Sequence, residues 1–155
     1  TDMGKLTKKM IDESESKVEA AGLKGVLKGK SILVASTDAH VYGIQYVKSI
    51  LESAGARVVD AGVDSSIPYI FDTADEEGID CIGVSTHNGQ ALGIADLLLE
   101  EMKKRDKTYT VFLGGRLNTI LPGHSEPSEV GDMINQKGIF AENDLVKTIQ
   151  MLREH

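Results

Sequence analysis

The sequence has one cysteine, no tryptophan and no long apolar run. A single cysteine cannot form an intramolecular disulfide, and no stretch approaches the about 18 apolar residues that a membrane-spanning helix needs. Aromatic residues make up only 5 % of the chain, which argues against an aromatic platform for stacking bases or sugars. Lys and Arg together number 17 against 24 Asp and Glu, for a net charge of −7, and the basic residues do not gather along one helix. We therefore expect no nucleic acid and no membrane among the partners.

The 155 residues suffice for one domain with a buried core, since domains usually have roughly 100 to 200 residues. Apolar residues at 41 % and charged residues at 26 % are ordinary globular proportions. The first stretch, residues 1–9, is polar and is not followed by an apolar targeting segment. Cys81 lies in an apolar run, where a small buried residue is expected rather than a reactive thiol. These features predict a cytoplasmic protein.

From Ser31 onward, short apolar runs rich in β-branched residues alternate with amphipathic stretches. The predicted strands are Ser31–Ser36, Arg57–Ala61, Cys81–Ser85, Thr108–Leu113 and Gly138–Ala141. The predicted helices are Ile44–Ala54, Pro68–Glu77, Gln90–Arg105, Ser128–Lys137 and Asn143–Arg153. The runs ILVA, CIGV and TVFL are continuously apolar, which is typical of strands covered on both faces by helices. The alternation predicts an α/β fold with a doubly wound, five-stranded parallel sheet and helices on both faces.

The first 29 residues differ from the rest. Leu6, Met10, Val18 and Leu23 stand at roughly helical spacing in a charged background. Such a segment is either one helix, packed on the body of the protein or on a partner, or a partly ordered linker. We therefore divide the chain into an N-terminal helical extension or linker, residues 1–29, and one domain, residues 30–155.

Loops rich in Gly, Ser, Asn, His and Asp follow the predicted strands, and ligands of open parallel sheets bind at the carboxyl ends of the strands. Neither a phosphate-binding GxxxxGK(S/T) loop nor a GxGxxG dinucleotide fingerprint follows any of these strands. A two-component receiver needs an acidic residue at the end of the third strand, where this chain has Ser85. The sequence therefore argues against these nucleotide-binding and receiver functions.

The loop after the first strand contains Asp38, His40 and Gly43 in the pattern Asp-x-His-x-x-Gly. Side chains two residues apart in a loop can face the same way, so the Asp38 carboxylate can accept a hydrogen bond from the His40 imidazole. Such a bond fixes the tautomer of the ring and makes its second nitrogen a better metal ligand. The pattern alone also occurs in ordinary surface loops, so it leaves both interpretations open.

Two further signatures accompany this pattern. The third strand ends in Ser85-Thr86-His87, and the fourth is followed by Gly114-Gly115. In this order and at these strand ends, the three patterns resemble the DxHxxG, SxL and GG signatures of cobalamin-binding domains, over about residues 30–155. The small subunit of glutamate mutase is similar in one more detail, a Tyr-Gly-Gln where this chain has Asn88-Gly89-Gln90. The resemblance implies a flavodoxin-like (Rossmann-like) form of the predicted sheet.

The resemblance implies a cobalamin bound "base-off, His-on", with His40 as the cobalt ligand and Asp38 as the acceptor of a hydrogen bond from His40. The displaced dimethylbenzimidazole would lie in a slot between the sheet and its helices, where Ser85 would hydrogen-bond the base and small residues would leave room. The residues that the resemblance assigns to the cofactor are Asp38, His40, Gly43, Ser85, Thr86, His87, Gly89, Gly114 and Gly115. His87 departs from the leucine of the SxL signature, and it could contact the tail, contact the corrin side chains or face solvent.

The resemblance also implies a partner. The chain shows no catalytic triad, paired carboxylates or redox thiol, so cobalamin would supply the chemistry. We expect the cofactor subunit of an adenosylcobalamin-dependent carbon-skeleton mutase, not catalytic alone, with the substrate bound by a larger, barrel-type catalytic subunit. The alternative is a corrinoid methyl carrier that uses methylcobalamin. Such carriers have an N-terminal bundle of several helices, whereas residues 1–30 supply about one. A cobalamin sensor or storage module is a third interpretation.

Overall fold

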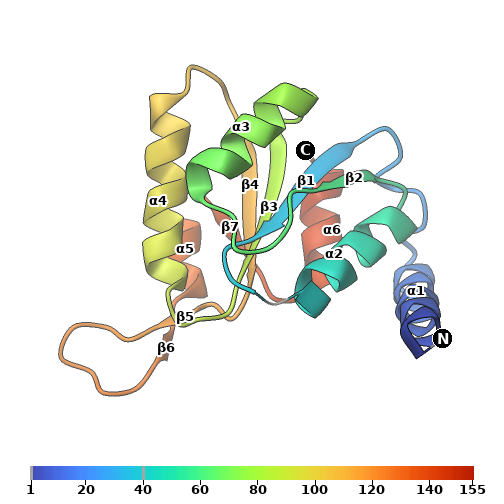
Figure 1. The fold of residues 1–155 in the computed structure, drawn as a ribbon, viewed down its shortest axis with the longest axis horizontal. Coiled ribbons are helices and arrows are strands. Elements are labelled where there is room, and N and C mark those ends of the chain that lie inside the picture. Colours follow the sequence, from blue (N-terminus) through green and yellow to red (C-terminus); the bar gives the residue numbers. More distant parts are fainter. Residues whose placement is uncertain (1, 40) are drawn as a thin grey trace.

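A five-stranded parallel sheet forms the centre of the computed structural model, which describes residues 2–39 and 41–155 (Figure 1). Its strands, in the order β2-β1-β3-β4-β7, are β1 (Ser31–Ser36), β2 (Arg57–Asp60), β3 (Cys81–Thr86), β4 (Thr110–Gly115) and β7 (Phe140–Ala141). The helices are α1 (Asp2–Ala20), α2 (Val41–Ser53), α3 (Ile67–Glu77), α4 (Ala91–Lys104), α5 (Gly131–Gln136) and α6 (Leu145–Arg153). The predicted doubly wound α/β sheet is confirmed.

The register of the sheet brings the carboxyl ends of its central strands to one edge. Ser36 of β1 lies opposite Ser85 of β3, and Thr86 of β3 lies opposite Gly115 of β4. The direction of winding reverses between β1 and β3, because β2 lies on one side of this pair and β4 and β7 lie on the other. In such a sheet the ligand crevice is expected at this switch point, beyond the carboxyl ends of β1 and β3.

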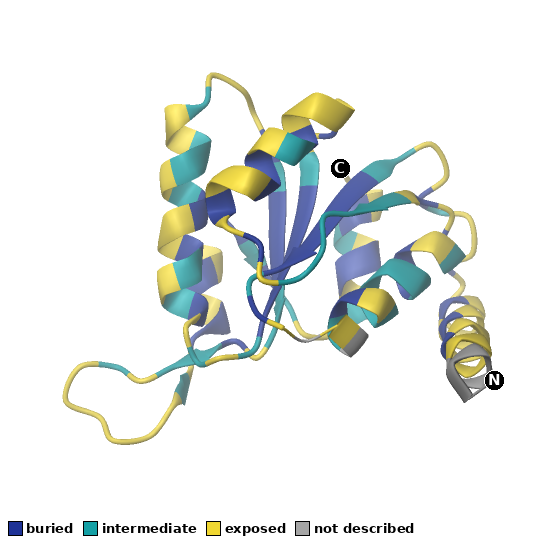
Figure 2. Cartoon of the chain, in the orientation of Figure 1, coloured by how far each residue is buried: buried dark blue, intermediate teal, exposed yellow. Residues whose placement is uncertain are grey.

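Helices cover both faces of the sheet because its central strands are apolar on both sides. On β1, Ile32 and Val34 belong to the cluster that contains the apolar residues of α2 and α6. Leu33 and Ala35 of the same strand belong to the cluster formed with α3, α4 and α5. Figure 2 shows the central strands as a buried layer between the helices. Helix α1 joins the α2–α6 side through Val18, which is buried in that cluster.

The ends of α3 are set by residues with well-understood capping roles. The Ser66 hydroxyl accepts a hydrogen bond from the Tyr69 backbone N–H at 3.3 Å, and Pro68 occupies the first turn, where its missing N–H is not needed. Gly78 ends the helix in the left-handed region, at φ +69°, and its N–H bonds the Ala74 carbonyl. The observed ends of α3 therefore agree with the predicted ends to within one residue.

Arg105, at the end of α4, joins α4 to α3. Its guanidinium donates hydrogen bonds to Asp72 and Asp75 of α3, both at 2.8 Å, and to Glu101 of α4 at 3.1 Å. The Tyr109 hydroxyl donates a further hydrogen bond to Asp75 at 2.6 Å. The hydrogen bond from Tyr109, together with that from Arg105, holds the pKa of Asp75 below its usual value.

The chain beyond β4 differs from the prediction. The predicted helix Ser128–Lys137 begins later, because residues 128–129 form β6 (Ser128–Glu129), which pairs antiparallel with β5 (Asn118–Thr119). The Glu129 carboxylate accepts a hydrogen bond from the Gly131 N–H at 2.7 Å, and α5 starts there. The loop between β5 and β6 projects from the sheet at the edge where β4 ends (Figure 1). In the part of the chain that the structure describes, no helix has both the length and the apolar character needed to cross a bilayer.

Candidate functional site

Asp38 is a buried carboxylate at the switch point of the sheet, with only 4 % of its surface exposed. The Ser36 hydroxyl donates to Asp38 Oδ1 at 3.1 Å, and the His87 backbone N–H donates to Oδ2 at 2.6 Å. The Asp38 carbonyl accepts a bond from the Asp64 N–H at 3.0 Å. Asp38 therefore ties the loops after β1, β2 and β3 together, and its carboxylate is held in a fixed position.

His40, the predicted cobalt ligand, lies outside the described residues. Its neighbours on both sides are exposed, Ala39 at the end of the loop and Val41 at the start of α2, with Val41 54 % exposed. The Val41 N–H donates a hydrogen bond to the Ala39 carbonyl at 3.0 Å. The position of His40 in the sequence thus lies between a fixed carboxylate, Asp38, and the beginning of α2.

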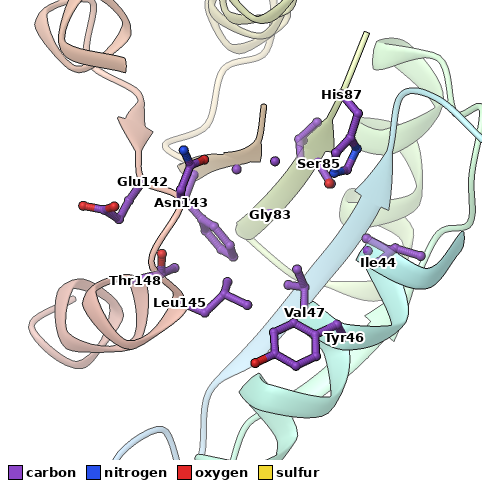
Figure 3. Close-up of a pocket in the computed structure, with 15 residues that line it drawn as sticks. Ile44, Tyr46, Val47, Gly83, Ser85, His87, Glu142, Asn143, Leu145 and Thr148 are labelled. Carbon is purple, nitrogen blue, oxygen red and sulfur yellow. The ribbon is translucent and has the colours of Figure 1, made fainter. Parts of the chain in front are cut away.

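A cavity of about 200 Å³ lies between the sheet and helices α2 and α6 (Figure 3). We call this cavity the slot. Its lining includes Gly83, Ser85, Phe112 and Gly114 from the sheet, Gly43, Tyr46 and Val47 from α2, and Leu145 and Thr148 from α6. Most of this lining is apolar, and the Ser85 hydroxyl lies on the side facing α2, 4.0 Å from where a Cβ at Gly43 would stand. A flat, mainly apolar group with one hydrogen-bonding atom fits a cavity of this kind.

Glycines keep the slot open where backbone and side chains approach closely. A Cβ at Gly114 would stand 3.3 Å from the Glu142 carbonyl oxygen. Gly115 has φ +96°, in the left-handed region, and a Cβ there would collide with the Thr86 carbonyl oxygen. The paired glycines of the sequence are therefore needed both for the shape of the chain and for the space beside it.

The ring of His87 lies across the mouth of the slot. Its Cε1 is 3.3 Å from the Cβ position of Gly43, and its Nε2 is 3.1 Å from that of Gly115. Its Nδ1 is 3.6 Å from Asp38 Oδ1, and the side chain is 21 % exposed. Figure 3 shows it beside Ser85. The ring therefore lies among the residues that line the slot, with part of its surface still reaching solvent.

The structure brings together most of the described site residues, but not all of them at the slot. Gly43, Ser85, His87, Gly114 and Gly115 line the slot, and Asp38 is bonded to His87. Thr86 is buried beside it, and its carbonyl accepts a hydrogen bond from the Arg116 N–H at 2.8 Å. Gly89, at φ +71°, forms the turn that leads into α4. Thr86 and Gly89 thus shape the backbone around the site.

Several slot residues were not predicted from the sequence. Gly83 lies two residues before Ser85, and this spacing on a strand places both on the same face. The sequence therefore contained the information needed to predict Gly83 as a slot residue. Phe112 precedes Gly114 by the same spacing on β4. The α6 side, with Leu145 and Thr148, had no comparable signal, because its place beside the sheet depends on packing between distant segments.

Comparison with known sequences gives a consistent result. The B12 binding domain family matches residues 31–139. Glutamate mutase sigma subunit 2 of Haloarcula marismortui is 30 % identical over 121 residues, which cover 77 % of this chain and 82 % of that protein. Methionine synthase of Mycobacterium leprae is also 30 % identical, over 131 residues, but the match covers 81 % of this chain and only 11 % of that protein.

Solved structures share the fold. A cobalamin-binding protein from Desulfitobacterium hafniense superposes with a TM-score of 0.64 at 20 % identity, over 83 % of this chain and 59 % of that one. The methanol:cobalamin methyltransferase complex of Methanosarcina barkeri gives a TM-score of 0.61 at 12 % identity, over 78 % of this chain and 44 % of that one. This chain therefore spans less than two thirds of either structure, and at such identities the likeness concerns the fold.

Proposed function

Because this chain belongs to the B12 binding domain family, we propose that it is the cofactor subunit of an adenosylcobalamin-dependent carbon-skeleton mutase. The chain is a cobalamin-binding domain homologous to the glutamate mutase sigma subunits. The observation that carries the proposal is the glycine-walled slot, which lies at the switch point of the sheet beside a fixed, buried carboxylate. A larger, barrel-type subunit would bind the substrate.

The extent of the sequence match supports the mutase assignment. The match covers 82 % of the glutamate mutase sigma subunit, so the two chains correspond over most of their lengths. In methionine synthase the corresponding part is 11 % of a much longer protein. We therefore propose that this chain, like its sigma-subunit relatives, presents the cofactor to a larger catalytic subunit.

The residues of the chain have distinct tasks in this proposal. His40 would hold the cobalt through one ring nitrogen, and the Asp38 carboxylate would accept the N–H of the second ring nitrogen. The two oxygens of a carboxylate offer about four acceptor sites, enough for Ser36, the His87 N–H and an imidazole N–H in addition. Ser85 hydrogen-bonds the displaced base within the slot. The chemistry that such a cofactor supplies is cleavage of a weak cobalt–carbon bond, which starts a radical rearrangement.

Reconstitution with cob(II)alamin tests the cofactor assignment. We expect the purified chain to retain the corrinoid, and its electron paramagnetic resonance spectrum to show the hyperfine splitting of one protein nitrogen. The His40→Ala variant should lose this splitting, whereas the matched variant His124→Ala, in the exposed β5–β6 loop, should keep it. Failure to retain any cobamide at micromolar concentration, or splitting that persists in His40→Ala, would contradict the assignment.

Asp38→Asn tests the role of the carboxylate. Groups that orient a metal ligand typically change metal affinity by about 10- to 100-fold when they are replaced, and we expect a loss of cobalamin affinity in this range. Binding is measured by titration followed in the visible spectrum. Unchanged affinity together with unchanged splitting would mean that Asp38 only organises the loops.

A corrinoid methyl carrier is the second candidate, and the match to methionine synthase over 81 % of this chain favours it. The two functions differ in what the loaded chain does with a partner. A mutase subunit with adenosylcobalamin should support rearrangement of a carbon skeleton by a large catalytic subunit, with the product identified by NMR. A methyl carrier with methylcobalamin should instead pass its methyl group to an acceptor in the presence of a methyltransferase.

A further inference from the structure

His87 occupies space at the mouth of the slot. Along β3 and just past its end, Gly83, Ser85 and His87 stand two residues apart, and all three line the slot. Gly83 lies deepest within the strand, and His87 is nearest the carboxyl edge. The ring spans from α2 to the end of β4, since it lies within 3.3 Å of the Cβ positions of both Gly43 and Gly115. A group that enters the slot from this edge meets the His87 ring first.

Two contacts with Asp38 hold His87, and they differ in what they fix. The backbone N–H of His87 donates to Asp38 Oδ2 at 2.6 Å, which fixes the main chain. The ring is held by a separate contact, between Nδ1 and Asp38 Oδ1 at 3.6 Å. A rotation of the side chain alone breaks the second contact and leaves the first intact. The main chain and the ring of His87 are thus tied to Asp38 by separate contacts.

The slot is small for a whole nucleotide tail. The cavity measures about 200 Å³, whereas pockets that bury a ligand of drug size begin at about 300 Å³. A nucleotide tail consists of a bicyclic base, a ribose and a phosphodiester, and the ring of His87 stands where this tail would pass.

We propose that His87 is the gate of the slot: its ring stands at the mouth and must swing aside before a nucleotide tail can enter. This inference rests on the proposed function, since it concerns how the same site is loaded. It makes His87 a residue that discriminates between corrinoids with and without a nucleotide tail. A corrinoid without a tail leaves the slot empty and does not need the gate to open.

Stopped-flow binding of cobalamin and of cobinamide, which lacks the nucleotide tail, tests this gate. We expect His87→Ala and His87→Leu to bind cobalamin about 2- to 5-fold faster than the wild type, because neither side chain makes the weak contact with Asp38 that holds the ring at the mouth. Cobinamide binding should not change. His124→Ala is the matched control and should resemble the wild type with both corrinoids, and urea midpoints show whether each variant is folded.

The NMR signal of the His87 Cε1–H, assigned by its loss in the alanine variant, gives a second measurement. It should shift further when cobalamin binds to the wild type than when cobinamide binds. Equal cobalamin rates in the wild type and both variants, or slower binding in the variants, would overturn the gate. The proposed function would still stand in that case, because it fails only if neither corrinoid binds the wild type at all.

Discussion

Gly83 and Phe112 face each other across β3 and β4 at the floor of the slot. A Cβ added to Gly83 would stand 2.6 and 3.0 Å from the two ε carbons of the Phe112 ring, and closer still to Cζ. Real Cβ atoms do not come this close to a neighbour, so the substitution Gly83→Ala forces the ring to move. The space around it is limited, because Phe112 is only 4 % exposed.

The change in the free energy of unfolding caused by Gly83→Ala follows from two opposing effects. An added methyl in a packed core costs about 1–3 kcal/mol, and replacing glycine by alanine returns about 0.4–1 kcal/mol by restricting the unfolded chain. We therefore expect Gly83→Ala to lower the free energy of unfolding by about 1–2 kcal/mol. All three clashing atoms are ring atoms that leucine does not have, so the same substitution in a Phe112→Leu background should cost nothing. The coupling between the two sites should be about 1–3 kcal/mol.

Urea unfolding of the four proteins of this double-mutant cycle measures the coupling. With a slope of about 1–3 kcal/mol per molar urea, the expected loss lowers the midpoint by roughly 0.5–1 M. Gly93→Ala, in α4, is the matched control. Apart from its chain neighbours and the backbone of its own helix, nothing lies within 4 Å of its Cβ position, and the substitution should raise stability by about 0.5–1 kcal/mol. The reasoning is refuted if Gly83→Ala costs the same in both backgrounds, or if both glycine variants shift the midpoint in the same direction.

Arg105→Ala should lower the free energy of unfolding by about 1–3 kcal/mol, because charge-assisted hydrogen bonds to three carboxylates are lost; an unchanged urea midpoint would contradict the contact between α3 and α4. The pKa of Asp75 is lowered in the folded state, so its contribution is complete above its unfolded value of about 3.9 and is lost as the pH falls through the folded value. Tyr109→Phe removes the main cause, and its urea midpoint should fall less between pH 6 and pH 3 than that of the wild type; an equal fall would count against this. Burial raises the pKa of Cys81 to about 12, so its thiol should not react with Ellman's reagent at pH 8 until urea unfolds the protein, and rapid reaction of the native chain would disprove it.

The parallel sheet could be predicted because its central strands are continuously apolar. The run Ile32–Ala35 is fully buried, with one pair of side chains on each face, and such a run has no other common explanation in a chain with helices between its strands. The β5–β6 pair could not be predicted in the same way. Each of its strands has only two residues, and their pairing depends on the fold around them rather than on a pattern of their own.

The parts of the site that depend on the type of a single residue could be predicted from the sequence. The parts that depend on packing between distant segments could not. Gly114 and Gly115 are needed for a close approach of backbone atoms, and a glycine pair after a strand indicates such a place. The position of the His87 ring depends on a side-chain rotamer and on Asp38, which lies 49 residues earlier in the chain. No local pattern contains that information, so the sequence left the environment of His87 open.

The two-residue period of a strand connects the parts of the slot to one another. Ile82 and Val84 belong to the core beneath α3 and α4, whereas Gly83, Ser85 and His87, which alternate with them, line the slot on the other face. The order of these residues along β3 is therefore also their order along the slot: Gly83 lies at its floor, the Ser85 hydroxyl lies in the middle and His87 lies at its mouth. Val84 contributes to the slot lining as well as to this core, and a shift of the strand by one residue would exchange the faces of all these side chains. Substitutions at these three positions should therefore have different effects. A larger residue at Gly83 should reduce the space in the slot, loss of the Ser85 hydroxyl should weaken hydrogen bonding to the base, and a change at His87 should alter the rate at which the cofactor binds.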